Sequence, residues 1–217
     1  MSELLTRRAW LLDLDGTLVD SSPGVIRAFH VAQAAFGEPP ADPERIGRAI
    51  GYPFAQTVAE LSRVSYELFF PRFRAEAMES MHHLSRLLPG ARELLEHLER
   101  ASRKLALVTS KQSDNARRIL AHLQVECCFA AVVGSESVTH PKPHPEPVRL
   151  AMERLGVRPV DAVMVGDTEN DVRAARSAGI PVIALAGGFD PPERLLGADL
   201  CLFGPQGLLD LLTKAGR

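Results

Sequence analysis

The chain has 217 residues, of which 46% are hydrophobic and 24% are charged, a composition typical of a globular protein with a substantial buried core. Its 25 basic and 27 acidic residues leave a formal net charge of −2, so the charge balance does not point to a nucleic acid or an anionic membrane as a partner. No apolar run approaches the roughly 18 residues that a membrane span needs. Acidic residues interrupt the apolar stretch near the N-terminus, so we expect no signal peptide.

The chain contains three cysteines, at positions 127, 128 and 201. The adjacent pair Cys127 and Cys128 suits neither an unstrained disulfide nor a CxxC redox or zinc motif. A sparse and odd number of cysteines is typical of a reducing cytoplasm. We therefore expect a cytoplasmic protein in which all three cysteines are small core residues.

Six short apolar runs alternate with helical patterns over most of the chain. The runs cover residues 10–12, 105–108, 130–133, 162–165, 182–185 and 200–203. They are apolar on both faces, which indicates strands of a parallel sheet that is covered on both sides. The predicted helices between them cover residues 90–102, 113–123, 145–155 and 168–178, and Gly156 and Gly179 stand where a left-handed glycine ends a helix. This alternation predicts an α/β fold with a Rossmann-like parallel sheet.

The stretch from Ser21 to Leu88 shows no strand and breaks this alternation. Ser22-Pro23 and Asp42-Pro43 each combine a helix-capping residue with a proline at the first helical position. Apolar residues at helical spacing predict a first helix that ends at Gly37 and a longer third helix around residues 68–78, and the cap at Asp42 predicts a second helix between them. We expect an all-helical cap domain at residues 21–85, inserted into a core of residues 1–20 and 86–217. The alternative is a set of extra helices packed on the flank of the sheet.

The sequence Asp13-Leu14-Asp15-Gly16-Thr17 follows the first predicted strand. The carboxyl ends of parallel strands form the edge at which ligands bind in open α/β sheets. Two carboxylates this close repel each other and need a cation or a shared proton. A site with only oxygen ligands favours Mg²⁺, and Gly16 lets the backbone turn tightly and present its amides.

Three other polar motifs stand at predicted strand ends or directly before helices. Thr109 and Ser110 place hydroxyls suited to phosphate oxygens after the second strand. Lys142 lies between two prolines in a chain with only four lysines, which indicates a positioned cation rather than a solvated surface charge. Asp167 and Asp171 follow another strand and open a helix, where their carboxylates would complete a metal site. All of these positions are expected at one edge of the sheet.

Taken together, these four motifs resemble those of haloacid dehalogenase-like hydrolases, in order and at plausible spacing along essentially the whole chain. The helical insert after the first motif resembles the cap of the phosphoglycolate phosphatase-like branch. The resemblance implies a Mg²⁺-dependent phosphatase that hydrolyses a small phosphorylated metabolite through an aspartyl-phosphate intermediate. Phosphoglycolate itself is an expectation from the family alone.

The resemblance also assigns roles to individual residues. Asp13 would be the nucleophile and Asp15 the general acid and base. Mg²⁺ would be bound by Asp13, Asp15 and Asp167. Substrate phosphate would be held by the catalytic Lys142 together with backbone amides near Gly16 and the side chains of Thr109 and Ser110. Asp171 is expected to support the site by orienting Lys142 or by binding ligand waters.

Other functions stay open at this point. The enzyme alternatives are a sugar phosphomutase of the β-phosphoglucomutase type and an inorganic pyrophosphatase. The non-enzyme alternative is a phospho-accepting, receiver-like signalling domain, although such domains are shorter and lack the second aspartate. A haloacid dehalogenase proper does not normally have an Asp at position 15, and the phosphonate-hydrolysing branch needs a cap lysine, whereas no lysine precedes Lys104. The expected partner is a small metabolite, with no nucleic acid and no membrane, and the sequence favours neither a monomer nor a homodimer.

Overall fold

Six parallel strands form the central sheet in the computed structural model, which describes residues 2–215. Their order across the sheet is β5-β4-β1-β6-β7-β8. The strands are β1 (Ala9–Leu12), β4 (Lys104–Val108), β5 (Ala131–Val133), β6 (Ala162–Gly166), β7 (Val182–Ala186) and β8 (Leu200–Phe203). All six lie within one residue of the runs predicted from the sequence, so the prediction of a Rossmann-like α/β sheet is confirmed.

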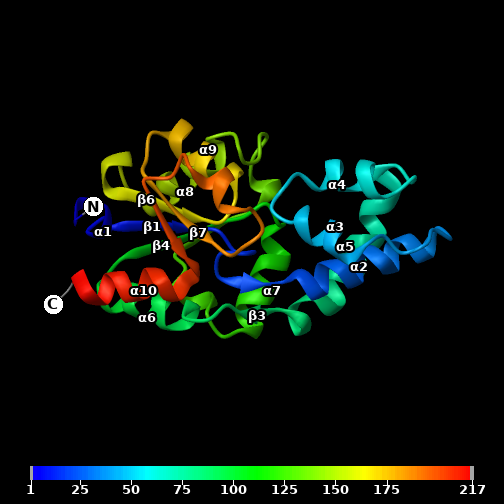
Figure 1. Ribbon diagram of the computed structural model, residues 1–217, viewed down its shortest axis with the longest axis horizontal. Helices are drawn as coiled ribbons and strands as arrows, with labels where there is room; N and C mark the ends of the chain where they lie inside the picture. The colour runs from blue at the N-terminus through cyan, green and yellow to red at the C-terminus, as the bar shows by residue number, and fades with distance from the viewer. Residues whose placement is uncertain (1, 216–217) are drawn as a thin grey trace.

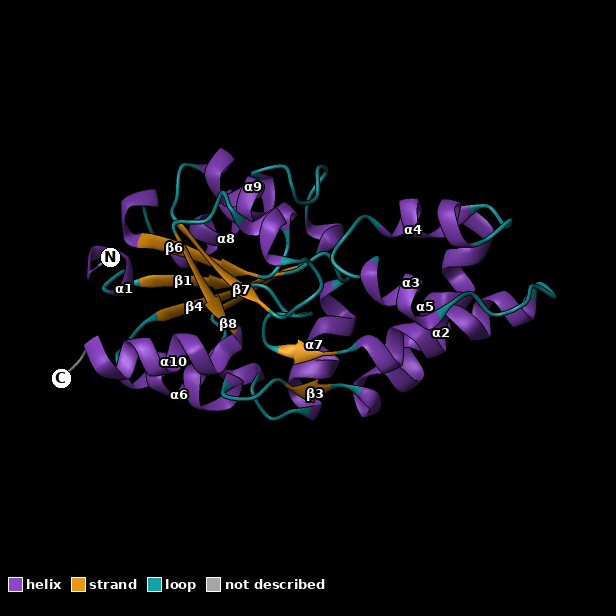
Figure 2. Cartoon of the chain, in the orientation of Figure 1, coloured by secondary structure: helices purple, strands orange, loops and turns teal. Residues whose placement is uncertain are grey.

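Helices cover both faces of this sheet, as Figure 2 shows. One face packs against α6 (Ala91–Arg100), α7 (Ser113–His122) and α10 (Gly204–Ala215), and the other against α8 (Glu146–Leu155) and α9 (Glu169–Ala178). Successive strand residues point to opposite faces. Leu12 and Leu107 therefore belong to the first apolar layer, and Leu11 and Val108 belong to the second. Because both layers are apolar, the strands show the continuous hydrophobic runs from which they were predicted.

A helical segment, called here the insertion (residues 22–84), stands beside the sheet at the end where β1 finishes (Figure 1). It consists of α2 (Ser22–Ala35), α3 (Pro43–Arg48), α4 (Phe54–Leu61) and α5 (Tyr66–Leu84). The long helices α2 and α5 pack along each other and bury Phe29, Phe69 and Met81 between the elements of the insertion. Within residues 2–215, no helix is both long and apolar enough to cross a membrane.

A short antiparallel pair of strands closes the base of the insertion. It consists of β2 (Val19–Asp20) and β3 (Arg86–Leu87), and it pairs Val19 with Leu87 and Asp20 with Arg86. The expectation of no strand between Ser21 and Leu88 is therefore wrong at β3. A strand of two residues is too short to produce a hydrophobic period, which is why the pattern missed it. The cap position of α2 is also one residue earlier than predicted, at Ser21, which makes no side-chain cap.

The remaining short elements are α1 (Ser2–Leu5) and four 3-10 turns at Glu126–Cys128, Ser135–Ser137, Pro159–Asp161 and Pro192–Leu195. The helix ends predicted at Gly156 and Gly179 are confirmed, because both glycines have positive φ and end α8 and α9. Thr168 caps α9 in a capping box with Asp171, each side chain bonding to the other residue's backbone amide. This cap fixes the backbone that carries Asp171.

The expectation that the three cysteines are core residues is wrong. Cys127 and Cys201 are exposed and Cys128 is half-buried. Cys127 and Cys128 lie in a surface 3-10 turn, and Cys201 points outward from β8, which ends the sheet and leaves alternate side chains uncovered. Burial raises the pKa of the Cys128 thiol to about 11, so this thiol stays neutral at physiological pH.

Candidate active site

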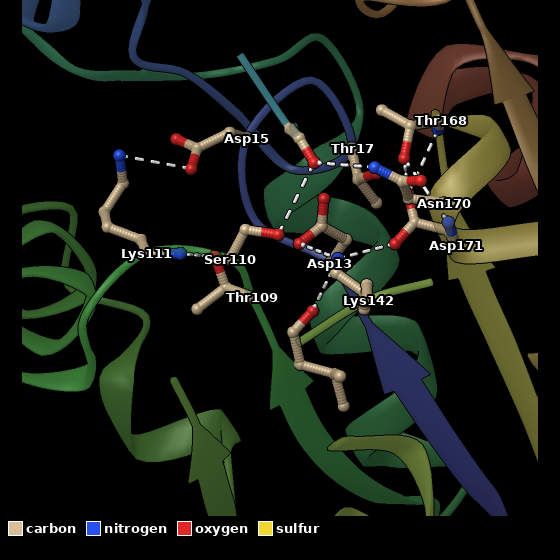
Figure 3. A network of polar contacts seen from close by, with 12 residues as sticks. Asp13, Asp15, Thr17, Thr109, Ser110, Lys111, Lys142, Thr168, Asn170 and Asp171 are labelled. Carbon is tan, nitrogen blue, oxygen red and sulfur yellow. Dashed lines mark hydrogen bonds and ion pairs between the residues drawn. The ribbon is translucent and has the colours of Figure 1, made fainter. Parts of the chain in front are cut away.

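Three neighbouring strands carry the predicted site residues to one edge of the sheet, which Figure 3 shows from close by. Asp13 follows β1, Thr109 follows β4 and Asp167 follows β6, and β1 lies between the other two strands. Because the strands are parallel, their carboxyl ends meet at the same edge. The turns after them therefore bring together residues that are far apart in the sequence.

Lys142 is held at the centre of this edge. Its Nζ lies 2.9 Å from Asp13 Oδ1 and 2.6 Å from Asp171 Oδ1, and it donates a hydrogen bond to the carbonyl of Val108 at 3.1 Å. The residue is only 3% exposed. Burial alone would lower the pKa of Lys142, but the carboxylates of Asp13 and Asp171 raise it above its usual value. The ammonium group therefore stays charged, as the flanking prolines suggested for a positioned cation.

Asp167 is fully buried and its two oxygens are fixed by separate donors. Oδ1 accepts a hydrogen bond from Thr17 Oγ1 at 2.9 Å, and Oδ2 accepts one from the backbone amide of Phe189 at 2.8 Å. The backbone passes so close that a Cβ on Gly16 or Gly188 would lie 2.1 or 2.2 Å from Asp167 Oδ2. Both positions therefore need glycine.

The three carboxylates of Asp13, Asp167 and Asp171 offer oxygens that all lie within 4.8 Å of one another. Burial raises the pKa of Asp13 to about 7 and raises that of Asp167 well above its usual range, and repulsion from the neighbouring carboxylates adds to both shifts. Asp13 Oδ1 accepts no hydrogen bond of good geometry among the described residues and faces only the ammonium of Lys142. Two of these carboxylates, those of Asp13 and Asp167, offer only oxygen ligands and fit a Mg²⁺ ion.

Asp171 differs from the other two because its oxygens are already engaged. Oδ1 pairs with Lys142, and Oδ2 accepts hydrogen bonds from the amide and the hydroxyl of Thr168 at 3.0 and 2.7 Å. The capping box of α9 therefore holds Asp171, and Asp171 holds Lys142. This arrangement makes Asp171 suited to positioning the lysine rather than to binding a metal ion.

Asp15 lies on a different side of the site from the other carboxylates. Its Oδ1 accepts a hydrogen bond from Ser21 Oγ, and its Oδ2 lies 3.2 Å from Lys111 Nζ. The structure thus places Asp171, and not the carboxylate of Asp15 as the sequence analysis expected, beside Asp13 and Asp167. The side chain instead lines the cavity that lies between the core and the insertion. Ser21 and Lys111 were not among the residues predicted for the site, although Lys111 directly follows the Thr109-Ser110 motif.

Thr109, Ser110 and Gly16 lie at the same edge, as predicted. Thr109 is buried, and its Oγ1 accepts a hydrogen bond from the amide of Lys111 at 3.1 Å. Ser110 Oγ donates to the carbonyl of Gly51 in the insertion at 3.5 Å. The amide of Gly16 donates to the carbonyl of Val19 at 2.9 Å, so this glycine closes the turn after β1 rather than offering its own N–H to a ligand.

The loop at Gly51-Tyr52 joins the insertion to the core. The carbonyl of Gly51 accepts a hydrogen bond from Asn170 Nδ2 at 3.4 Å. Tyr52 donates its hydroxyl hydrogen to the Asp190 carboxylate, whose oxygens lie 2.8 and 2.9 Å away, and accepts a hydrogen bond from Arg194 at 2.7 Å. Burial, followed by the Asp190 carboxylate, raises the pKa of Tyr52 above its usual value, so the hydroxyl stays protonated. The loop therefore holds the insertion over the carboxyl edge of the sheet.

A cavity of about 430 Å³ lies between the insertion and this edge. From the core, Asp15, Ser110, Lys111 and Lys142 line it. From the insertion, mostly apolar and aromatic side chains line it. The site can therefore enclose a ligand whose one end reaches the buried charges and whose other end contacts the insertion.

Residues 10–185 match the family model described as haloacid dehalogenase-like hydrolase. A phosphoglycolate phosphatase from Photorhabdus laumondii is 32% identical over 225 residues, which cover 96% of this chain and 92% of that protein. An N-acetylmuramic acid 6-phosphate phosphatase from Pseudomonas aeruginosa is 32% identical over 216 residues and 96% of both chains. Among solved structures, a haloacid dehalogenase-like hydrolase from Streptococcus pneumoniae superposes with a TM-score of 0.84 at 28% identity, covering 97% of this chain and 99% of that chain.

Proposed function

Since the chain belongs to the haloacid dehalogenase-like hydrolase family, we propose that it is a Mg²⁺-dependent phosphatase of a small phosphorylated metabolite. The observation that carries the proposal is the buried group of Asp13, Lys142 and Asp171 beside Asp167, in which Lys142 also lines the cavity at the carboxyl edge of the sheet. The curated relatives reported above are phosphatases of two different metabolites, and they support the reaction class rather than a particular substrate.

Asp13 is the proposed nucleophile. A carboxylate oxygen of Asp13 attacks phosphorus, the bond from phosphorus to the alcohol oxygen breaks, and an aspartyl-phosphate forms. The departing alkoxide takes a proton from Asp15, which lies on the insertion side of the site. Asp15 then removes a proton from a water molecule that attacks the aspartyl-phosphate, which releases inorganic phosphate and restores Asp13. Lys111 and Ser21 hold the Asp15 carboxylate in place between the two steps.

Asp13 and Asp167 are the residues that would hold Mg²⁺, since their carboxylates lie close together and Asp171 is occupied by Lys142 and Thr168. A bound Mg²⁺ would neutralise part of the negative charge of the carboxylates and of the substrate phosphate. Lys142 supplies a fixed positive charge beside Asp13, and Thr109 and Ser110 supply hydroxyls for the remaining phosphate oxygens. Without a cation, burial raises the pKa of Asp13 to about 7, so a large fraction of the residue is protonated and unreactive near neutral pH.

The insertion acts in this proposal as a cap domain, covering residues 21–85, over a core of residues 1–20 and 86–217. Its Gly51-Tyr52 loop touches the core edge, so movement of the insertion would admit substrate and then exclude bulk water. We also propose that the enzyme works in a reducing cytoplasm, which the three unpaired cysteines support.

The test is phosphate release from a panel of phosphomonoesters and pyrophosphate, measured with Mg²⁺ and with a chelator. We expect Mg²⁺-dependent release that is lost in Asp13→Asn and reduced about 10²–10⁴-fold in Asp15→Asn. After rapid acid quenching, mass spectrometry of Asp15→Asn should show the phosphate adduct on Asp13. Activity that persists in Asp13→Asn, or after complete removal of Mg²⁺, would contradict the proposal. Release from pyrophosphate alone would favour a pyrophosphatase instead.

A further inference from the structure

Four of the aromatic side chains that the insertion presents to the cavity form one cluster, called here the aromatic wall: Phe54, Tyr66, Phe70 and Phe73. Their rings touch one another: Phe54 and Phe73 have ring centroids 4.2 Å apart, and Tyr66 and Phe70 stack at 5.2 Å. All four are half-buried, so part of each ring stays accessible although the rings pack together. The wall comes from two helices, α4 and α5, whose packing fixes the orientation of the rings.

The rest of the surface that the insertion contributes to the cavity is mostly apolar, with Tyr52, Thr57 and Arg74 as its polar side chains. It includes Val25, Phe29, Ile46, Ile50, Ala77 and Met78. The one cationic side chain that lines the cavity from the insertion is Arg74, within the part of the chain that the structure describes. Its Nη2 lies 2.5 Å from Asp114 Oδ2, and its Nε donates to Gln112 Oε1 at 2.5 Å. The guanidinium of Arg74 is therefore already paired with a carboxylate and is turned toward the core helix α7.

The cations on the core side of the cavity are likewise paired. Lys142 lies between Asp13 and Asp171, and Lys111 lies beside Asp15. A substrate phosphate bound at Asp13 would pair with Lys142. Glu136 adds a negative charge to the lining of the cavity. A second anionic group on the substrate would meet aromatic rings and paired ions, and it would lose its hydration without gaining a partner.

We propose that the preferred substrate is a phosphomonoester whose alcohol part carries an uncharged ring, and that this ring lies against the aromatic wall. This inference rests on the proposed phosphatase function. A flat ring gains both apolar contact and ring stacking from such a wall, whereas a charged two-carbon acid gains neither. The cavity of about 430 Å³ has room for a ring of this kind beyond the phosphate. The structure thus points away from the small carboxylate-bearing substrate for which several relatives are named.

The first experiment compares benzyl phosphate with phosphoglycolate. Both release a primary alkoxide, but benzyl phosphate carries an aromatic ring where phosphoglycolate carries a carboxylate. For the wild-type enzyme with Mg²⁺, we expect kcat/KM for benzyl phosphate to be at least about tenfold higher. Phe73→Ala should lower kcat/KM for benzyl phosphate about tenfold and leave phosphoglycolate within about twofold. Phe73→Tyr keeps the ring and should therefore keep the preference for benzyl phosphate. This variant distinguishes a loss of ring stacking from a loss of folding.

Two further variants serve as controls. Phe36→Ala removes an exposed phenylalanine of the insertion that does not line the cavity, and it should leave both substrates unaffected. Arg74→Gln should also leave benzyl phosphate unaffected. A preference for phosphoglycolate that is lost in Arg74→Gln would overturn the proposal, because Arg74 would then bind the substrate carboxylate. That result would leave the phosphatase function intact.

Binding to Asp13→Asn, measured by calorimetry with the same two compounds, separates the two proposals when turnover fails. Benzyl phosphate that binds more tightly than phosphoglycolate, with affinity reduced about tenfold by Phe73→Ala in the same background, supports the ring-bearing ligand even if the wild-type protein releases no phosphate. Equal or weaker binding of benzyl phosphate overturns it, whatever the outcome of the phosphatase assay.

Discussion

The two sides of the cavity differ in the kind of contacts that build them and in how well each side tolerates amino-acid substitutions. The core side consists of buried charges, each fixed by a specific partner, such as Lys142 between Asp13 and Asp171. The insertion side consists of apolar and aromatic side chains whose contacts are numerous and non-directional. A network of buried charges fails when one member is lost, whereas an apolar wall can be repacked with moderate cost. The core side therefore defines the reaction, and the insertion side defines what is brought to it.

The strongest way to test this contrast is to remove the charge of Asp13. Asp13→Asn should lower kcat at least about 10³-fold, because the proposed nucleophile is lost. It should also stabilise the metal-free protein at pH 8. Burial raises the pKa of Asp13 from 3.8 to about 7, so the folded state holds this proton more tightly than the unfolded state does.

The sign of the pH dependence follows from that shift. The contribution of Asp13 to the free energy of unfolding falls as the pH rises from about 4 to about 7, and it stays unfavourable above that pH. The gain in melting temperature from Asp13→Asn should therefore be large at pH 8 and small at pH 5 in the presence of a chelator. An equal gain at both pH values would show that burial of the charge is not its cause.

The next largest effect is expected from Lys142→Met, which leaves two buried carboxylates without their cation. We expect a loss of about 3–5 kcal/mol in the free energy of unfolding and a fall in kcat/KM of about 10²-fold or more. Chemical denaturation and phosphate release measure the two effects. Lys104→Met is the matched control, because Lys104 is exposed and bonds only to the carbonyl of Leu155. A similar loss in both variants would argue against a special role for the buried lysine.

A smaller effect is expected where the backbone approaches Asp167. The Cβ of Gly188→Ala would lie 2.2 Å from Asp167 Oδ2, so this carboxylate or the loop must move. We expect kcat to fall about tenfold and the Mg²⁺ concentration for half-maximal activity to rise. Gly207→Ala is the control, since its Cβ would lie 3.7 Å from the Cβ of Leu202, which is ordinary contact. Unchanged Mg²⁺ dependence in Gly188→Ala would remove Asp167 from the proposed metal site.

The smallest effect should come from Tyr52→Phe, which loosens the contact between the two sides. The lost hydroxyl links Asp190 and Arg194, and a hydrogen bond of this type contributes about 1 kcal/mol, so kcat/KM should fall only about fivefold. Tyr66→Phe is the control, because the ring of Tyr66 in the aromatic wall is kept. Hydrogen exchange of the Gly51-Tyr52 loop should rise in Tyr52→Phe alone.

The sequence was most informative where pattern and chemistry coincide. The strands could be located because a doubly covered strand is apolar along its whole length, and the polar residues after β1, β4 and β6 then had to share one edge. This reasoning placed Asp13, Thr109 and Asp167 together, although they come from three separate parts of the chain. Lys142 could be added because flanking prolines and the scarcity of lysine set it apart.

The features that could not be predicted depend on side-chain orientation or on what covers a surface. The carboxylate of Asp15 turns toward Lys111 and Ser21, a choice of rotamer that spacing along the chain does not reveal. Cys201 is exposed because β8 is the last strand, and an apolar run does not show whether the sheet continues beyond it. The bond between Tyr52 and Asp190 joins residues 138 positions apart and has no local signal.

The two-residue pair of β2 and β3 has a consequence for how such a protein can diversify. The chain leaves the sheet at Asp20 and returns at Arg86, and these residues face each other across one ladder. The entropic free-energy cost of closing a loop grows by only about 0.6 kcal/mol for each doubling of the loop length. The stability of the sheet therefore depends little on the length of the chain between these two residues. An inserted segment of another size or shape could start and end at the same β2–β3 pair. Proteins with different insertions could then act on different molecules while the carboxyl edge of the sheet stays unchanged.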